Sequence, residues 1–148
     1  TQGSTLFPYT TLFRSSFTTT ENRFRQQVNV DNFAKIGPVN VSGRVRLEER
    51  WRDGVAGTGW RLRPYVKFSL PIHGKTSLNL THESFINLNT TTFQKVDGYD
   101  RWRTGLSVST PLAKNVSLDV GYLNQHGFVR NGPDTDDHVA TLGLTANF

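Results

Sequence analysis

Charged side chains occupy alternate positions in several stretches of this sequence. Arg44, Arg46 and Glu48 are each separated by one residue, and the same parity recurs further along the chain. Guanidinium groups form short, bidentate hydrogen bonds with carboxylates, and guanidinium in excess attracts anions. We expect Glu83 to be flanked by Arg63 on one side and by Arg101 or Arg103 on the other. The predicted charge network comprises Arg44, Arg46, Glu48, Arg50, Arg61, Arg63, Lys67, Glu83, Arg101, Arg103 and Asp119.

The histidines offer a weaker basis for chemistry. His82 precedes Ser84 by two positions, whereas His73, His126 and His138 are scattered along the chain. Nucleophilic catalysis by serine needs a base within hydrogen-bond reach and a third group that orients the base. No Ser-His-Asp order and no metal-ligand spacing connects these residues. We therefore predict no catalytic residue, no metal site, no cofactor and no enzymatic activity.

The alternation also indicates which elements carry the charges. Alternation is the pattern of a strand whose two faces meet different surroundings. It is clearest in Val41–Leu70, which predicts two long strands joined at Asp53-Gly54. A soluble sheet buries its apolar face and turns its charges to water. A membrane β-barrel turns apolar residues to lipid and charges into a closed lumen.

Seven such strands are predicted, and no helix-period segment competes with them. Strands of about 10 to 13 residues exceed the globular mode of ~5–6 and reach the ~9–11 needed to cross a bilayer. Short and longer connections alternate, so that short turns gather at one end of the sheet, as in outer-membrane barrels. The predicted strands are 22–32, two strands within 41–70, and then 76–88, 100–112, 116–125 and 138–148.

Aromatic residues favour the membrane interpretation. With the longer loops outside, the three tryptophans fall at one height on the apolar face, where an interfacial belt belongs. The last strand ends in phenylalanine, which resembles the signal read by the outer-membrane assembly machinery. The predicted aromatic girdle is Trp51, Trp60, Trp102 and Tyr122, and the predicted assembly signal is Leu142, Leu144 and Phe148.

Composition excludes several classes of protein. The 148 residues carry a net charge of +5 at pH 7 and include no cysteine, which excludes a disulfide framework and a thiolate metal site. No stretch approaches the ~20 apolar residues of a membrane helix. A mean hydropathy of −0.47 is compatible with a barrel, because only alternate residues meet lipid. The basic residues alternate instead of clustering with stacking aromatics, so no nucleic-acid partner is predicted.

The first fifteen residues need a separate interpretation. The segment TLFPYTTLFRS looks like the translation of a sequencing adapter. Residues 1–15 are therefore predicted to be a non-native tail outside the fold. The absence of methionine agrees with a reading frame entered in its middle. Residues 16–148 are then expected to be the C-terminal part of one outer-membrane β-barrel domain.

Six blocks of sequence carry a family resemblance. In order they read RVRLEERW, WRLRPYVKFSLP, HESFINL, DRWRTGLSV, GYLNQHG and DDHVATLGLTANF. Together they resemble a bacterial family catalogued as domain of unknown function 2490. The resemblance implies a Gram-negative outer-membrane β-barrel without an established activity. It also implies that the family's N-terminal portion is missing, leaving about seven strands of a larger, even-stranded barrel.

The expected fold is thus all-β, an antiparallel up-and-down transmembrane β-barrel in the bacterial outer membrane. Its expected partners are outer-membrane lipid, lipopolysaccharide and the outer-membrane assembly machinery, and the oligomeric state is left open. Three functions fit the charged side chains. The first is structural, with Arg–carboxylate ladders filling a narrow lumen. The second is a small anion-preferring pore or transport protein, and the third is a lipid-modifying outer-membrane enzyme.

Overall fold

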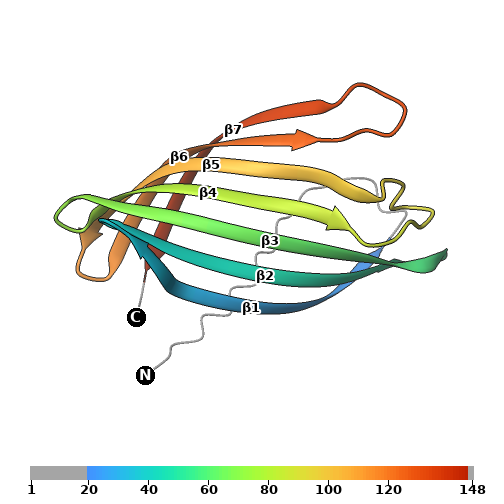
Figure 1. Ribbon diagram of the computed structural model, residues 1–148, viewed down its shortest axis with the longest axis horizontal. Coiled ribbons are helices and arrows are strands. Elements are labelled where there is room, and N and C mark those ends of the chain that lie inside the picture. The colour runs from blue at the N-terminus through green and yellow to red at the C-terminus, as the bar shows by residue number, and fades with distance from the viewer. Residues whose placement is uncertain (1–19, 147–148) are drawn as a thin grey trace.

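The computed structural model describes residues 20–146, which form seven antiparallel strands in one sheet. Each strand pairs with its neighbour in the chain, and the sheet is curled and strongly twisted (Figure 1). The predicted all-β, up-and-down architecture is confirmed. No helix within the described residues is long and apolar enough to cross a membrane. The strands are β1 (Glu21–Ile36), β2 (Val39–Arg52), β3 (Val55–His73), β4 (Thr76–Asn87), β5 (Gly98–Ala113), β6 (Val116–Gly127) and β7 (Thr135–Ala146).

Three short turns lie at one end of the sheet, and the two longer loops lie at the other end together with the β2–β3 turn (Figure 1). Residues 37–38, 74–75 and 114–115 form the turns at one end, and the loops 88–97 and 128–134 lie at the other. Gly37 and Gly74 adopt φ angles of 59° and 56°. This left-handed conformation carries no steric penalty for glycine and lets a strand reverse within two residues. The predicted alternation of connection lengths is therefore present from β3 to β7, but it fails at the β2–β3 connection, where residues 53–54 form a two-residue turn at the loop end.

Strand β1 continues past its predicted end at residue 32. Val30 pairs with Gly43, whereas the next pairing joins Ala34 to Val41, so β1 contains a bulge. Asn32 lies inside the bulge with a φ of 50°, a conformation that asparagine tolerates better than most residues. The residues between Val30 and Ala34 form the bulge, and β1 pairs with β2 again from Ala34 onward.

The pairing register separates the residues into two faces. Glu48 pairs with Arg61, and Leu80 pairs with Leu106 on the opposite side of the sheet. One side, here called the charged face, carries the whole predicted charge network together with Glu21, Arg23, Phe85 and Gln125. The other side, the apolar face, carries Val45, Leu47, Trp51, Trp60, Leu80, His82, Ser84, Trp102, Leu106, Val120, Tyr122 and Leu142.

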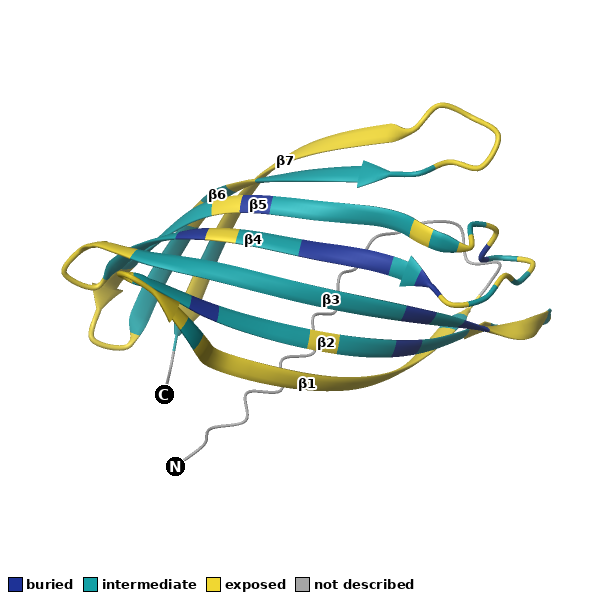
Figure 2. Cartoon of the chain, in the orientation of Figure 1, coloured by how far each residue is buried: buried dark blue, intermediate teal, exposed yellow. Residues whose placement is uncertain are grey.

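Burial is distributed unequally between the two faces. On the charged face Glu48 is 1% exposed and Glu83 is 8% exposed, whereas Leu106 and Leu142 on the apolar face are 48% and 78% exposed. Figure 2 shows that buried residues gather on the central strands, while β1 and β7 at the two edges are mostly exposed. The buried hydrophobic side chains within residues 20–146 are Val41 and Phe85.

Candidate functional site

Glu48 forms the most buried centre of the charged face. It accepts hydrogen bonds from Arg61 Nε at 3.1 Å and Nη2 at 2.8 Å, and from Arg63 Nη1 at 2.6 Å. Arg46 approaches the same carboxylate at 3.8 Å. The register places Arg61 directly opposite Glu48, so the pairing of β2 with β3 creates this cluster. A buried carboxylate is tolerated only when such partners compensate its lost hydration.

Glu83 joins a neighbouring cluster, which includes one arginine that was not predicted beside it. Its Oε1 accepts hydrogen bonds from Arg44 Nη2 at 2.6 Å and from Arg63 Nη2 at 2.9 Å. Arg63 therefore bridges the two buried glutamates. Arg101 Nε instead lies 3.3 Å from Asp100, and Arg103 Nε donates to Gln125 at 2.6 Å. Both predicted neighbours are therefore present, with Arg63 in contact on one side and Arg103 directly opposite Glu83 on β5. The ion-pair partner that was not predicted is Arg44 of β2, which reaches across β3 on the same side as Arg63.

Glu21 is a third carboxylate centre that the sequence prediction missed. It accepts hydrogen bonds from Arg50 Nε at 2.9 Å, Arg52 Nε at 3.0 Å and Arg23 Nε at 2.7 Å. Arg50 therefore belongs to this cluster and not to that of Glu48. Glu21 and Arg23 are two positions apart on one strand, so their side chains lie on the same face. This spacing is the sequence signal that could have placed Glu21 on the charged face. The sequence does not show that β1 pairs with β2 closely enough to bring Glu21 to Arg50.

Phe85 lies among the arginines of the charged face. The Cζ atoms of Arg61, Arg63, Arg101 and Arg103 lie 5.4, 4.3, 5.9 and 4.9 Å from the centre of its ring. Guanidinium groups are attracted to an aromatic face at such distances, so the ring supports several cations at once. Phe85 is two positions from Glu83, so strand alternation places it on the same face, but the sequence analysis assigns it no role. A cavity of about 300 Å³ adjoins it, lined by Arg23, Arg50, Arg61, Arg63, Phe85, Arg101 and Arg103.

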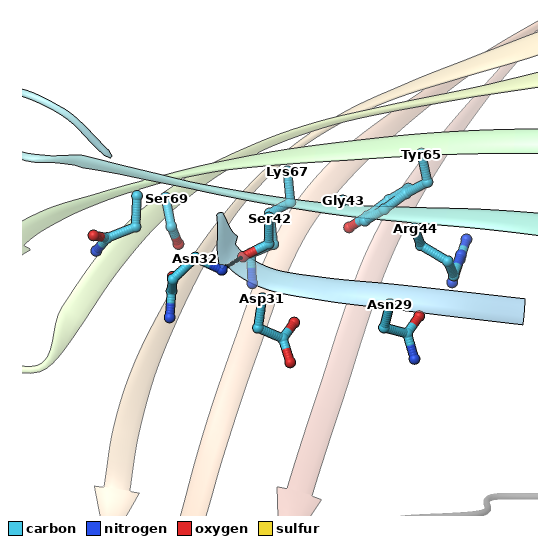
Figure 3. Close-up of a pocket in the computed structure, with 10 residues that line it drawn as sticks. Asn29, Asp31, Asn32, Ser42, Gly43, Arg44, Tyr65, Lys67 and Ser69 are labelled. Atoms are coloured by element: carbon cyan, nitrogen blue, oxygen red, sulfur yellow. Dashed lines mark hydrogen bonds between the residues drawn. The ribbon is translucent and has the colours of Figure 1, made fainter. Parts of the chain in front are cut away.

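Lys67 and Asp119 lie on the charged face but apart from these clusters. Lys67 lines a second cavity of about 290 Å³, where Figure 3 shows it near Ser42. Asp119 accepts a hydrogen bond from Ser109, whose Oγ accepts one from Asn79 Nδ2 at 2.8 Å. The predicted network is therefore divided into Arg–Glu clusters and a separate polar chain. The second cavity is lined by Asn29, Asp31, Asn32, Asn40, Ser42, Gly43, Arg44, Tyr65, Lys67 and Ser69.

The predicted girdle residues all lie on the apolar face, and they are staggered along the strands. Trp60 pairs with Glu49, and Trp102 pairs with Ser84. The rings of Trp102 and His126 stack with centroids 5.4 Å apart. Trp51 and Tyr122 are exposed on the same face, as are Leu142 and Leu144 of the predicted assembly signal. Tyr122 pairs with Leu106, which lies in the middle of β5 and four residues from Trp102. Phe148, together with the predicted tail at residues 1–15, lies outside the described residues.

His82 and Ser84 contact each other on the apolar face. The Oγ of Ser84 lies 3.3 Å from His82 Nε2, and His82 Nδ1 lies 2.9 Å from Thr104 Oγ1 on β5. The sequence shows the spacing of His82 and Ser84. It does not show that Thr104 lies beside them, because Thr104 is on the next strand, beyond the 88–97 loop. His126 instead contacts Asp136 Oδ1 at 2.9 Å.

Comparisons with known proteins identify the family. The family described as "Protein of unknown function (DUF2490)" matches residues 3–136. The chain belongs to the DUF2490 family. It is similar to an uncharacterised protein of Methylorubrum extorquens, with 30% identity over 132 residues that cover 86% of this chain and 57% of that relative. This DUF2490 chain thus spans just over half the length of the relative. No solved structure matches it.

Proposed function

We propose that this DUF2490 chain forms part of an outer-membrane β-barrel whose charged face lines a lumen filled by its own ion pairs. The observation that carries the proposal is the inverted burial of the two faces, with Glu48 1% exposed and Leu142 78% exposed. In water, contiguous exposed apolar surface of this kind is unfavourable and is covered by a partner or a membrane. In an outer-membrane barrel the same face meets lipid, and the polar face is enclosed.

Closure of the barrel would require further strands. β1 and β7 each pair with one neighbouring strand within residues 20–146, and open edges of this kind template aggregation. The relative is longer than this chain, so a protein of that length has residues available for more strands. We infer that the apolar face contacts outer-membrane lipid and lipopolysaccharide. Leu142 and Leu144 of β7, together with Phe148 in the sequence, would be recognised by the assembly machinery.

Leu106→Arg tests the membrane location. Near the bilayer midplane an arginine on the lipid side of a barrel costs ~2–4 kcal/mol, whereas an exposed substitution in water usually changes stability by less than about 0.5 kcal/mol. We expect the larger loss when unfolding is measured in lipid bilayers. Val129→Arg is the matched control, since Val129 is similarly exposed but lies in the 128–134 loop. Equal, small effects of both substitutions would contradict the proposal.

The arginine-lined cavity beside Phe85 favours a second candidate, a small anion-preferring pore or transport protein. Arg103 has no carboxylate within salt-bridge distance among the residues described here. Uncompensated guanidinium along a lumen would raise the local concentration of anions. The two candidates differ in whether water reaches the ion pairs of Glu83.

Glu83→Gln, introduced into a barrel closed by the further strands, separates these two candidates. In a filled lumen the loss of a buried ion-pair partner costs ~3–5 kcal/mol, and planar bilayers should show no conductance. In a water-filled pore solvent screening reduces the cost towards ~0–1 kcal/mol, and the conductance should shift towards anions. If neither stability nor conductance changes, Glu83 does not line a lumen, and both candidates are wrong.

A further inference from the structure

We propose that His82, Ser84 and Thr104 form an esterase site on the apolar face, which hydrolyses the acyl esters of membrane lipids. This activity goes beyond the structural role of the charged face, because the three side chains project from the opposite side of the sheet. The choice of a lipid as substrate rests on the proposed membrane location. The chemistry of the site rests only on the local geometry.

Strand geometry brings the nucleophile and the base together. His82 and Ser84 are two positions apart on β4, so their side chains share a face. Ser84 Oγ lies 3.3 Å from His82 Nε2, within the looser range expected of a catalytic pair before substrate binds. Serine becomes a nucleophile when a base of this kind takes its proton.

Thr104 is the positioning residue of the site. Its Oγ1 lies 2.9 Å from His82 Nδ1. When Nδ1 carries the proton and donates it to Thr104, Nε2 is left free to accept the proton of Ser84, which is the tautomer that a general base requires. The Trp102 ring, with its centroid 6.0 Å from that of His82, packs against the imidazole. The imidazole is thus held by one hydrogen bond and one ring contact.

Tyr99 supplies a hydrogen-bond donor at the nucleophile. Its hydroxyl lies 2.7 Å from Ser84 Oγ. Ser84 is 5% exposed, whereas Tyr99 is about half exposed and open to solvent or lipid on its outer side. Rotation of the Tyr99 side chain would uncover Ser84 for an ester carbonyl. The same hydroxyl could then donate to the oxyanion that develops on the carbonyl oxygen, and such donors are a major source of catalysis in acyl transfer.

The site lies at the depth where lipid esters are found. Ser84 pairs directly with Trp102, one of the residues predicted for the aromatic girdle on the apolar face. Tryptophan in such a girdle marks the membrane–water interface. The ester bonds of a lipid join its apolar chains to its polar headgroup at this same interface, and water for hydrolysis reaches it. Acyl esters of phospholipid or of lipopolysaccharide are therefore the substrate class.

The reaction proceeds in two steps and needs no reactant besides the ester and water. Ser84 Oγ attacks the carbonyl carbon while His82 Nε2 takes its proton, and the Tyr99 hydroxyl donates to the oxyanion. The bond to the alcohol oxygen breaks, the alcohol leaves with the proton from His82, and the acyl group stays on Ser84. Water then attacks the acyl group and gives a proton to His82. The fatty acid leaves, and the proton returns to Ser84 Oγ.

Ester hydrolysis by the full chain in detergent micelles tests the proposal. The substrates are p-nitrophenyl butyrate, which is soluble, and didecanoyl phosphatidylcholine in mixed micelles. We expect both to be cleaved, Ser84→Ala to reduce the rate to the background, and His82→Gln to lower kcat by roughly 10²-fold or more. Thr104→Val should lower kcat at unchanged KM, and Thr104→Ser should restore it.

His126→Gln is the matched control, because His126 stacks on the same tryptophan but contacts Asp136 and not a serine. It should leave the rate unchanged, and circular dichroism should show that each variant keeps its strand content. Labelling by a fluorophosphonate, followed by mass spectrometry, should modify Ser84 in the parent chain and not in His82→Gln. Three results would overturn the esterase: no cleavage above background, unchanged cleavage by Ser84→Ala, or equal losses with His82→Gln and His126→Gln. Cleavage of the soluble ester alone would overturn the lipid substrate without deciding the location of the barrel.

Discussion

The charged and apolar faces of this sheet are built from the same strands, yet they are stabilised in opposite ways. On the charged face, long side chains reach across strands and bury one another, as Arg44 of β2 does when it reaches Glu83 of β4. On the apolar face, Leu106 and Val120 remain about half exposed. Buried charge and a large contiguous exposed apolar patch are both rare in soluble proteins. Their occurrence on the two sides of one strand indicates a sheet whose apolar face needs a covering medium.

The difference also shows how a face made of ions can be packed. Burial of a lone charge is very unfavourable, and a buried ion pair often adds little net stability. Here each glutamate serves several guanidinium groups, and Arg63 serves both Glu48 and Glu83. Shared partners fix the relative positions of β2, β3 and β4. We infer that the charged face determines the geometry of the sheet more than its net stability.

The largest expected effect comes from breaking the charged face at its most buried point. Glu48→Gln leaves Arg61 and Arg63 without their shared carboxylate, and loss of one partner from a buried pair typically costs ~3–5 kcal/mol. Glu49→Gln is the matched control on the apolar face of the same strand, where Glu49 is opposite Trp60. Removing that charge should be neutral or stabilising. Urea unfolding in detergent micelles measures both effects.

Equal effects at the two positions would contradict the comparison. A loss below about 1 kcal/mol for Glu48→Gln would mean that water screens the cluster as it screens an exposed pair. A large loss for Glu49→Gln would mean that the apolar face contains an ion pair of its own. Either result would remove the distinction between the faces on which the barrel proposal depends.

The sequence predicted the faces well because alternation is a property of each strand separately. Parity alone placed Glu48, Glu83 and the tryptophans on their correct sides. It supplied only some partners, such as Arg63 for Glu83, because a contact between strands also depends on register and on the reach of a side chain. Glu83 therefore acquired Arg44, two strands away, and Glu21 was missed at the edge of β1.

The same limit explains two further omissions. In the sequence, Phe85 is an apolar residue among charged ones. The register places Arg101 opposite it, and three further guanidinium groups lie near its ring. His82 and Ser84 are visible as a pair in the sequence, but the residue that orients the imidazole lies on the next strand. A sequence search for serine, histidine and aspartate cannot find Thr104, because Thr104 is neutral and only the pairing of β4 with β5 brings it to His82.

An intermediate effect is expected from the glycines, which differ between the faces. A Cβ at Gly121, on the charged face, would lie 2.6 Å from Ser107 Cβ and 2.7 Å from the Leu106 carbonyl oxygen. Because the backbone cannot yield, Gly121→Ala should cost ~1–3 kcal/mol. At Gly43, on the apolar face, the nearest atom is Cε1 of the exposed Phe33 at 3.1 Å. That ring can move aside, so Gly43→Ala should be close to neutral in the same unfolding measurement.

The smallest expected effect tests whether the apolar face is dry. The hydroxyl of Tyr122 hydrogen-bonds with His138 Nδ1, and their rings stack with centroids 6.0 Å apart. Tyr122→Phe keeps the stacked ring and removes only the hydrogen bond. If water covers this face, water replaces the lost partner, and a double-mutant cycle with His138→Ala should show almost no coupling. If lipid or detergent covers it, nothing replaces the partner, and the coupling should reach about 0.5–1.5 kcal/mol. Zero coupling in micelles would show that water reaches Tyr122, as at a membrane–water interface, whereas strong coupling would place Tyr122 deeper than the predicted girdle.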